Sequence, residues 1–71
     1  MNKQNQREII KAWVNSRPKD GGKRVVGTGI FLESIGTKYV HLSSIWNDGT
    51  GKCVGNYRQS YSDFIQSHNL I

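Results

Sequence analysis

Several kinds of residue are scarce in this chain, and each scarcity excludes a class of protein. Cysteine occurs once, at Cys53, so no disulfide framework can support the fold. A secreted domain this small would normally need several disulfides, so a reducing cytoplasm is the expected location. The longest early apolar run is Ala12-Trp13-Val14, which is too short for a signal peptide or a membrane span. We therefore expect a cytoplasmic protein that has no membrane partner.

The residue patterns that carry catalysis are also missing. Gly27-Thr28-Gly29 lacks the third glycine of a nucleotide-binding loop, and Gly21-Gly22-Lys23 lacks the rest of a P-loop. His41 and Cys53 are expected about 13 Å apart along neighbouring strands, too far for a base and its nucleophile. His41 and His68 have no second cysteine or paired acid at metal-ligand spacing. The sequence predicts a protein that is not an enzyme and uses neither a cofactor nor a metal.

The chain is long enough for one small domain. Its 71 residues are 35% hydrophobic, a fraction that is low for a globular domain but well above that of a disordered tail. We treat residues 1–71 as one domain whose core depends on its aromatic residues.

Positive charge is concentrated in the first third of the chain. The net charge is +5. Residues 1–24 hold seven basic and two acidic residues, or +5, whereas residues 25–71 hold three of each, which cancel. Such asymmetry indicates an anionic partner, either nucleic acid or an acidic protein surface, although a solvated basic face would have the same composition.

The first element is predicted to be a helix. Asn5 and Glu8 have the spacing of a capping box, and apolar residues then recur every three or four positions from Ile9 to Val14. Pro18 disfavours helical geometry at Arg17, so the helix should end near Ser16. Residues 19–22 are expected to form a flexible loop.

From Arg24 the pattern changes to strands. Residues 24–34, 38–46 and 52–59 are predicted strands, with turns at Ile35-Gly36 and at residues 47–51. Ser60 and Asp63 have the spacing of a second capping box, which would open a short final helix ending near His68. The predicted fold class is α+β: a helix, a three-stranded antiparallel sheet that could curl into a small barrel, and a short C-terminal helix.

The turns also predict a register. A two-residue turn at Ile35-Gly36 pairs residues whose numbers sum to 71, and pairing Trp46 with Lys52 gives sums of 98. Both sheet faces are then substantially apolar, so the helices cover opposite faces, the sheet curls, or one face meets a partner. Gly27 and Gly29 favour strong bending or close approach of another backbone.

The spacing of glycines and aromatics resembles a known family of DNA-binding domains. From Gly29 onward the chain is similar to the three-stranded domains at integrase N-termini and in plant ethylene-response factors. The matching elements are Gly29-Ile30, Gly36 with Lys38-Tyr39, Val54-Gly55-Asn56-Tyr57 and Ser60-Tyr61-Ser62-Asp63-Phe64. The resemblance implies a sheet placed in the DNA major groove and backed by the C-terminal helix. The element order also resembles the double-stranded RNA-binding fold.

We therefore predict a small nucleic-acid-binding domain, with DNA favoured over RNA, whose basic N-terminal segment contacts phosphates. The alternative is a protein-interaction module or inhibitor, of the kind common in phages and mobile elements, that docks through an apolar sheet face. The predicted nucleic-acid-binding residues are Arg7, Lys11, Arg17, Lys19, Lys23, Arg24, Lys38 and Arg58. The predicted partner-binding residues are Phe31, Leu42 and Trp46, and Cys53 and Trp13 are expected in the core.

Overall fold

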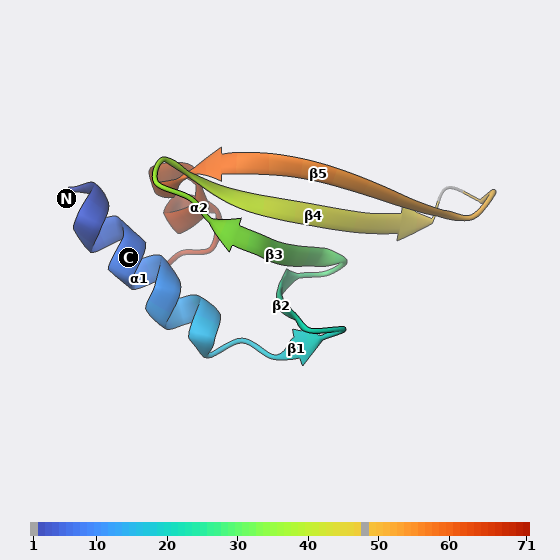
Figure 1. Ribbon diagram of the computed structural model, residues 1–71, viewed down its shortest axis with the longest axis horizontal. Coiled ribbons are helices and arrows are strands. Elements are labelled where there is room, and N and C mark those ends of the chain that lie inside the picture. The colour runs from blue at the N-terminus through green and yellow to red at the C-terminus, as the bar shows by residue number, and fades with distance from the viewer. Residues whose placement is uncertain (1, 48) are drawn as a thin grey trace.

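The computed structural model describes residues 2–47 and 49–71, which form two helices and a five-stranded antiparallel sheet (Figure 1). The elements are α1 (Lys3–Asn15), β1 (Lys19–Asp20), β2 (Lys23–Gly27), β3 (Ile30–Ile35), β4 (Tyr39–Asn47), β5 (Lys52–Ser60) and α2 (Tyr61–Ser67). The strands pair in chain order, β1-β2-β3-β4-β5. The predicted α+β class is confirmed, but the predicted count of three strands is wrong.

The first helix begins earlier than the Asn5 capping box indicated. Asn2 is the N-cap, and its side-chain oxygen accepts a hydrogen bond from the backbone N–H of Asn5 at 2.8 Å. Either asparagine could cap this helix, and the earlier one adds a turn. The helix ends at Asn15 with Ser16 as its C-cap, as the proline at position 18 predicted.

Two extra strands arise where the sequence indicated a loop and a continuous strand. Lys19 and Asp20 pair with Arg24 and Lys23 across Gly21-Gly22, so the expected loop is a tight hairpin. Both glycines have positive φ, 62° and 84°, which a two-residue hairpin turn of this hand requires. The predicted strand 24–34 is likewise broken by a turn at Thr28-Gly29.

Gly29 is fixed by the close approach of another strand. Its φ is +68°, and a Cβ atom placed there would lie 2.7 Å from the carbonyl oxygen of Ile45. The backbone N–H of Ile45 donates to the Gly29 carbonyl at 2.8 Å. The expectation that this glycine permits close approach of a backbone is confirmed.

The predicted registers are wrong. Across β3 and β4, Leu32 pairs with Leu42, and a bulge at Glu33 shifts the next pair to Ser34 and His41. Across β4 and β5, Trp46 pairs with Cys53 rather than Lys52, and this register runs without a break. The loop between β3 and β4, residues 36–38, is longer than the two-residue turn assumed, whereas Asn47 pairs with Lys52, so the connection between β4 and β5 is one residue shorter than assumed. A slip of one residue moves every side chain to the other face. The part of the predicted 47–51 turn that falls on Asp48 lies outside the described residues.

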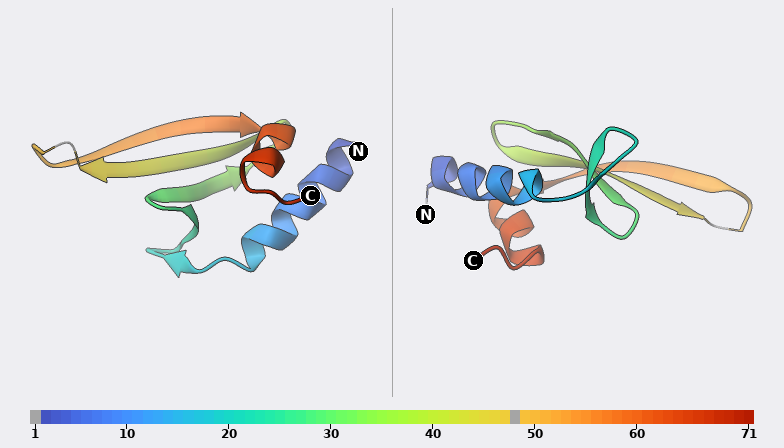
Figure 2. Two further views of the ribbon diagram at one scale, coloured as in Figure 1. Left: turned by 180° about the vertical axis from the view of Figure 1, so that it is seen from behind. Right: turned by 90° about the horizontal axis from the view of Figure 1, so that it is seen from below.

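The core forms between the two helices and one face of the sheet. Its buried side chains are Ile10, Val14, Val26, Val40, Leu42, Tyr61, Phe64 and Ile65. Val40 and Leu42 alternate along β4, so they mark one face, and α1 and α2 contact each other as well as the sheet. The left panel of Figure 2 shows α2 next to the end of β5, at the opposite end of the β4–β5 hairpin from its turn. Both helices therefore pack on the same face of the sheet. Among the described residues β1 does not pair with β5, so the sheet does not close into a barrel.

The second helix closes the core as the sequence predicted. Ser60 is its N-cap and accepts a hydrogen bond from the backbone N–H of Asp63 at 3.2 Å. His68 is the C-cap, and its ring lies 4.2 Å from that of Phe64 and 4.9 Å from that of Trp13. Trp13, which was predicted in the core, packs edge-on against Phe64 but is only partly buried, so it borders the core cluster.

The β4–β5 hairpin extends beyond the rest of the molecule. The last residue pair between β3 and β4 is Ile30 with Ser44, and β4 then continues to Asn47 with β5 as its main partner. This projection, to the right in Figure 1, makes the molecule elongated at 43 × 20 × 20 Å. We call residues 45–47 and 52–54 the arm. In the described part of the chain, no helix has the length and apolar character needed to cross a membrane.

Candidate nucleic-acid interface

One face of the sheet is left uncovered by the helices. Register places on it the odd-numbered side chains of β4, the even-numbered side chains of β5, and Phe31 opposite Ser43. The side chains of this open face are Phe31, Tyr39, His41, Ser43, Ile45, Asn47, Lys52, Val54, Asn56, Arg58 and Ser60. Polar and charged groups dominate its middle, and apolar groups lie towards the arm. This surface is more polar than a protein core and more apolar than an ordinary solvent-exposed sheet face.

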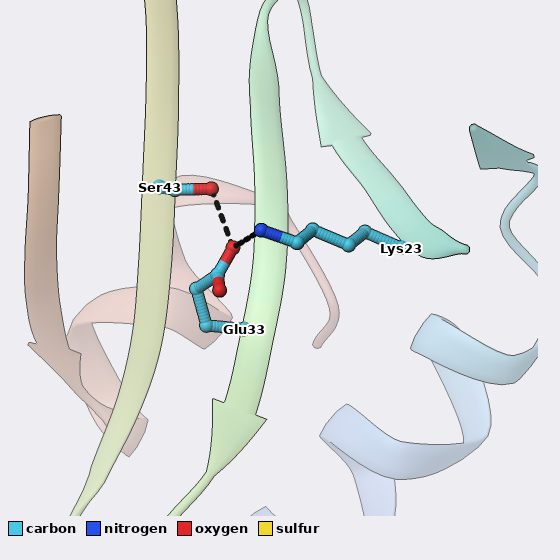
Figure 3. A network of polar contacts seen from close by, with 3 residues as sticks. All are labelled: Lys23, Glu33 and Ser43. Atoms are coloured by element: carbon cyan, nitrogen blue, oxygen red, sulfur yellow. Dashed lines mark hydrogen bonds and ion pairs between the residues drawn. The ribbon is translucent and has the colours of Figure 1, made fainter. Parts of the chain in front are cut away.

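A polar network connects three strands across this face. The bulge at Glu33 directs its carboxylate to the open side, where one oxygen accepts from Lys23 Nζ at 2.6 Å and from Ser43 Oγ at 2.7 Å (Figure 3). Ser43 is 3% exposed, so this bond satisfies a buried hydroxyl. The network connects the β1–β2 hairpin to the central strand, and it reduces the positive charge that Lys23 presents.

The network predicts a specific dependence of stability on pH. The hydrogen bond from Lys23, and then that from Ser43, lower the pKa of the Glu33 carboxyl. A lowered pKa means that the stabilisation is complete above the unfolded-state pKa of about 4.3 and is lost as pH falls through the folded value. The free-energy difference between wild type and Glu33→Gln should therefore be largest above about pH 5 and shrink in acid. Urea unfolding between about pH 3 and pH 6 measures it, and a difference that stays constant with pH would contradict the assignment.

The middle of the open face carries a stacked cation. The Arg58 guanidinium lies 4.3 Å from the centre of the Tyr39 ring. Arg58 pairs with His41 across the two strands, and Asn56 pairs with Ser43. The contact of Arg58 with Tyr39 is a cation–π interaction, which restrains the guanidinium over the ring. Arg58 and Asn56 are both exposed, so their hydrogen-bonding groups are open to a ligand.

A groove occupies the arm end of the open face. It encloses about 460 Å³ and lies between the β1–β2 hairpin, which contributes Asp20 and Lys23, and the arm, which contributes Lys52. Phe31, Ile45 and Val54 line its apolar part. The hairpin that the sequence indicated as a loop therefore forms one wall of the groove.

Three of the predicted phosphate-contacting residues have structural partners instead. Arg7 donates to the carbonyl of Ile35 at 3.4 Å, and Arg17 donates to the carbonyl of Val25 at 3.0 Å. Arg24 donates to the carbonyl of Arg17 at 2.7 Å. All three side chains are half-buried. Their charges contribute to the field around the protein, but part of their hydrogen-bonding capacity is used within the fold.

The other five predicted basic residues are exposed and lie on different parts of the surface. Arg58 is on the open face, and Lys23 lies at its edge with Glu33. Lys19 is on β1, Lys38 is in the loop before β4, and Lys11 is on α1, on the helical side of the molecule. The structure therefore does not gather the predicted set into one surface.

The predicted partner-binding residues do not share a surface. Leu42 is 1% exposed and belongs to the core, so it is unavailable to a partner. Phe31 is on the open face, whereas Trp46 is on the opposite face, where its ring covers Gly55 at about 3.1 Å from an ideal Cβ position. The predicted apolar patch is wrong because it rested on the incorrect register. Cys53 is half-buried and lies outside the core cluster, which corrects its predicted place as well.

Sequence reasoning missed Tyr39, Asn56 and Lys52 as members of the same face. Grouping these residues requires the register between β4 and β5. That register depends on the length of the loop, which the sequence of residues 47–51 does not determine. Among the described residues, no group of three or more His, Cys, Asp or Glu side chains is placed to hold a metal ion.

Comparison with known proteins adds no relative. No family model matches the chain, and the searches of curated proteins and of solved structures each found no match.

Proposed function

We propose that this protein binds nucleic acid, duplex DNA in preference to RNA, through the open face of its sheet. The observation that carries the proposal is that both helices pack on one face, leaving Asn56, Arg58 and Lys52 exposed on the other. A cationic surface with fixed hydrogen-bonding groups suits a phosphate-lined groove.

The side chains of the open face favour base edges over unstacked bases. Arginine pairs with the guanine edge and asparagine with the adenine edge in the major groove. Recognition of single-stranded RNA relies instead on exposed aromatic platforms. Tyr39 is already covered by Arg58, and Phe31 is half-buried in the groove. A two-stranded ribbon also fits a major groove about 12 Å wide, and the arm is such a ribbon.

The direct test is equilibrium binding of a labelled random-sequence DNA duplex of about 16 base pairs at low salt, followed by fluorescence anisotropy. We expect saturable binding that is tighter than binding of the same single strand or of an RNA duplex. Absence of binding to every one of these probes at low salt would overturn the proposal.

The apolar part of the groove supports a second candidate, a protein-interaction module. Phe31, Ile45 and Val54 would receive an apolar side chain of a partner, and Val54 is 65% exposed. Binding of this kind would depend weakly on salt, because rim charges chiefly affect association rates. Salt dependence therefore separates the two candidates.

A further inference from the structure

Strand β5 forms the outer edge of the sheet with nine residues and no partner on its far side in the described part of the chain. The backbone N–H of Ile45 donates to Gly29, so the backbone groups of Ile45 point towards β3. Since the N–H and C=O of a strand residue point to the same side, Val54, which is paired with Ile45, directs its own groups away from β4. The same holds for the other even-numbered residues of β5, including Asn56 and Arg58. These groups form an unused hydrogen-bonding edge.

Exposed apolar side chains are concentrated beside this edge. Of the four large hydrophobic side chains that are exposed in the described residues, three lie on the β4–β5 hairpin: Trp46 at 49%, Val54 at 65% and Tyr57 at 40%. Edge strands that remain monomeric are usually short or carry inward-pointing charge. This edge is long, and the five residues between Lys52 and Arg58 carry no charge and include the exposed Val54 and Tyr57.

We propose that the occupant of this edge is a second copy of the chain, with the two β5 strands antiparallel and the two-fold axis at Asn56. Opposed residues in antiparallel strands lie on the same face, so the axis of a symmetric pair must pass beside a residue rather than between two. An axis at Gly55 would oppose Lys52 to Arg58 of the second copy, which places like charges together. An axis at Tyr57 would oppose Val54 to Ser60 and leave Val54 without an apolar neighbour.

The axis at Asn56 gives each exposed apolar group a neighbour. Val54 then faces the aliphatic stem of Arg58 of the second copy. Gly55 faces Tyr57 of the second copy, which brings that ring beside Trp46, because the Trp46 ring already lies over Gly55. The outward groups of residues 54, 56 and 58 supply six backbone hydrogen bonds across the seam.

Dimerisation at β5 would join two open faces into one. The two copies of Arg58 and Asn56 would then lie about a two-fold axis perpendicular to the sheet, which suits a DNA site made of two inverted half-sites. This consequence rests on the proposed function, whereas the dimer itself is measured without nucleic acid. An interface of this kind lies at or below about 1,200 Å², the weak end of specific interfaces, so we expect micromolar dissociation.

A first pair of variants removes or keeps one of the outward backbone N–H groups of β5. Asn56→Pro removes an N–H that points away from β4, so the β4–β5 ladder keeps its hydrogen bonds. Asn56→Ala keeps that N–H and serves as the control. Sedimentation equilibrium from about 10 µM to about 1 mM should show a dimer for wild type and Asn56→Ala, weakened at least tenfold in Asn56→Pro.

A second pair at an exposed position tests the register. Val54→Lys places a like charge opposite Arg58 of the second copy and should weaken the dimer at least tenfold, whereas Val54→Glu should preserve or tighten it. Backbone amides of residues 54, 56 and 58 should exchange more slowly at high protein concentration, while those of residues 55 and 57, which face β4, should not change. A monomer throughout this concentration range, or a dimer indifferent to Asn56→Pro and Val54→Lys, would overturn the proposal.

Discussion

Raising the salt concentration from about 50 to about 200 mM is expected to weaken duplex binding by roughly 10² to 10³-fold. Each neutralised phosphate releases counterions, so four to six contacts give a log–log slope of roughly −4 to −5. The net charge of +5, with exposed cations such as Lys52 and Arg58 on the open face, is consistent with that number of contacts. Anisotropy titrations at four or five salt concentrations measure the slope.

A shallow dependence of binding on salt would point to a different contact surface. Binding that falls less than about tenfold over the same range would mean that few phosphates are contacted. The apolar groove, with Phe31, Ile45 and Val54, would then be the better candidate for the contact surface. If binding is electrostatic, repeating the titration with added magnesium should also weaken binding to the same duplex, because Mg²⁺ competes with the protein for the phosphates.

Replacing Gly29 with alanine is expected to cost about 2 to 4 kcal/mol of folding free energy. A left-handed φ costs a non-glycine residue about 1 to 2 kcal/mol, and here φ is +68°. The added Cβ would also lie 2.7 Å from the Ile45 carbonyl oxygen, so β3 and β4 must separate at a point where Ile45 donates to Gly29. Urea unfolding measures the loss, which is a large fraction of the stability of so small a domain.

Gly22→Ala is the matched control for this substitution. Gly22 also has a positive φ, +84°, but no heavy atom lies within 4 Å of its ideal Cβ position. Gly22→Ala should therefore lower the free energy of unfolding only by the conformational cost of about 1 to 2 kcal/mol. Equal losses for the two variants would show that the contact with β4 contributes nothing.

The helices and the fold class could be predicted because their signals are local. Apolar spacing from Ile9 to Val14 fixes the first helix, and Ser60 with Asp63 fixes the start of the last. Pro18 sets the end of the first helix for a steric reason that needs no tertiary context. These features depend on residues within a few positions of one another.

The registers could not be predicted because they depend on loops and on a bulge. Gly21-Gly22 and Thr28-Gly29 look like loop or strand residues until a partner strand is known. The bulge at Glu33 leaves no clear mark in the sequence, yet it directs the carboxylate to Lys23 and Ser43. The predicted register between β3 and β4 opposed Phe31 to Val40 rather than to Ser43, and this error was enough to place Trp46 and Phe31 on the same predicted face.

The candidate site was partly accessible from the sequence. Arg58 was among the predicted nucleic-acid-binding residues, but its stacking partner is Tyr39, nineteen positions earlier in the chain. The concentration of charge in residues 1–24 was a weaker guide. Arg7, Arg17 and Arg24 each donate to a backbone carbonyl within the fold. Charge counts report the field of a protein but not which side chains remain open to a partner.

The most direct test of the open face compares two charge-matched double variants in the same duplex-binding assay. Lys52→Ala with Arg58→Ala removes two exposed positive charges from the open face, and Lys3→Ala with Lys11→Ala removes two from α1. Both reduce the net charge from +5 to +3. We predict that the open-face variant weakens binding at least tenfold and makes the salt slope shallower by about 2, since each lost contact contributes about 0.9. The α1 variant should change the slope by less than about 0.5. Equal effects of the two variants, or a larger effect of the α1 variant, would contradict the assignment of nucleic-acid binding to the open face.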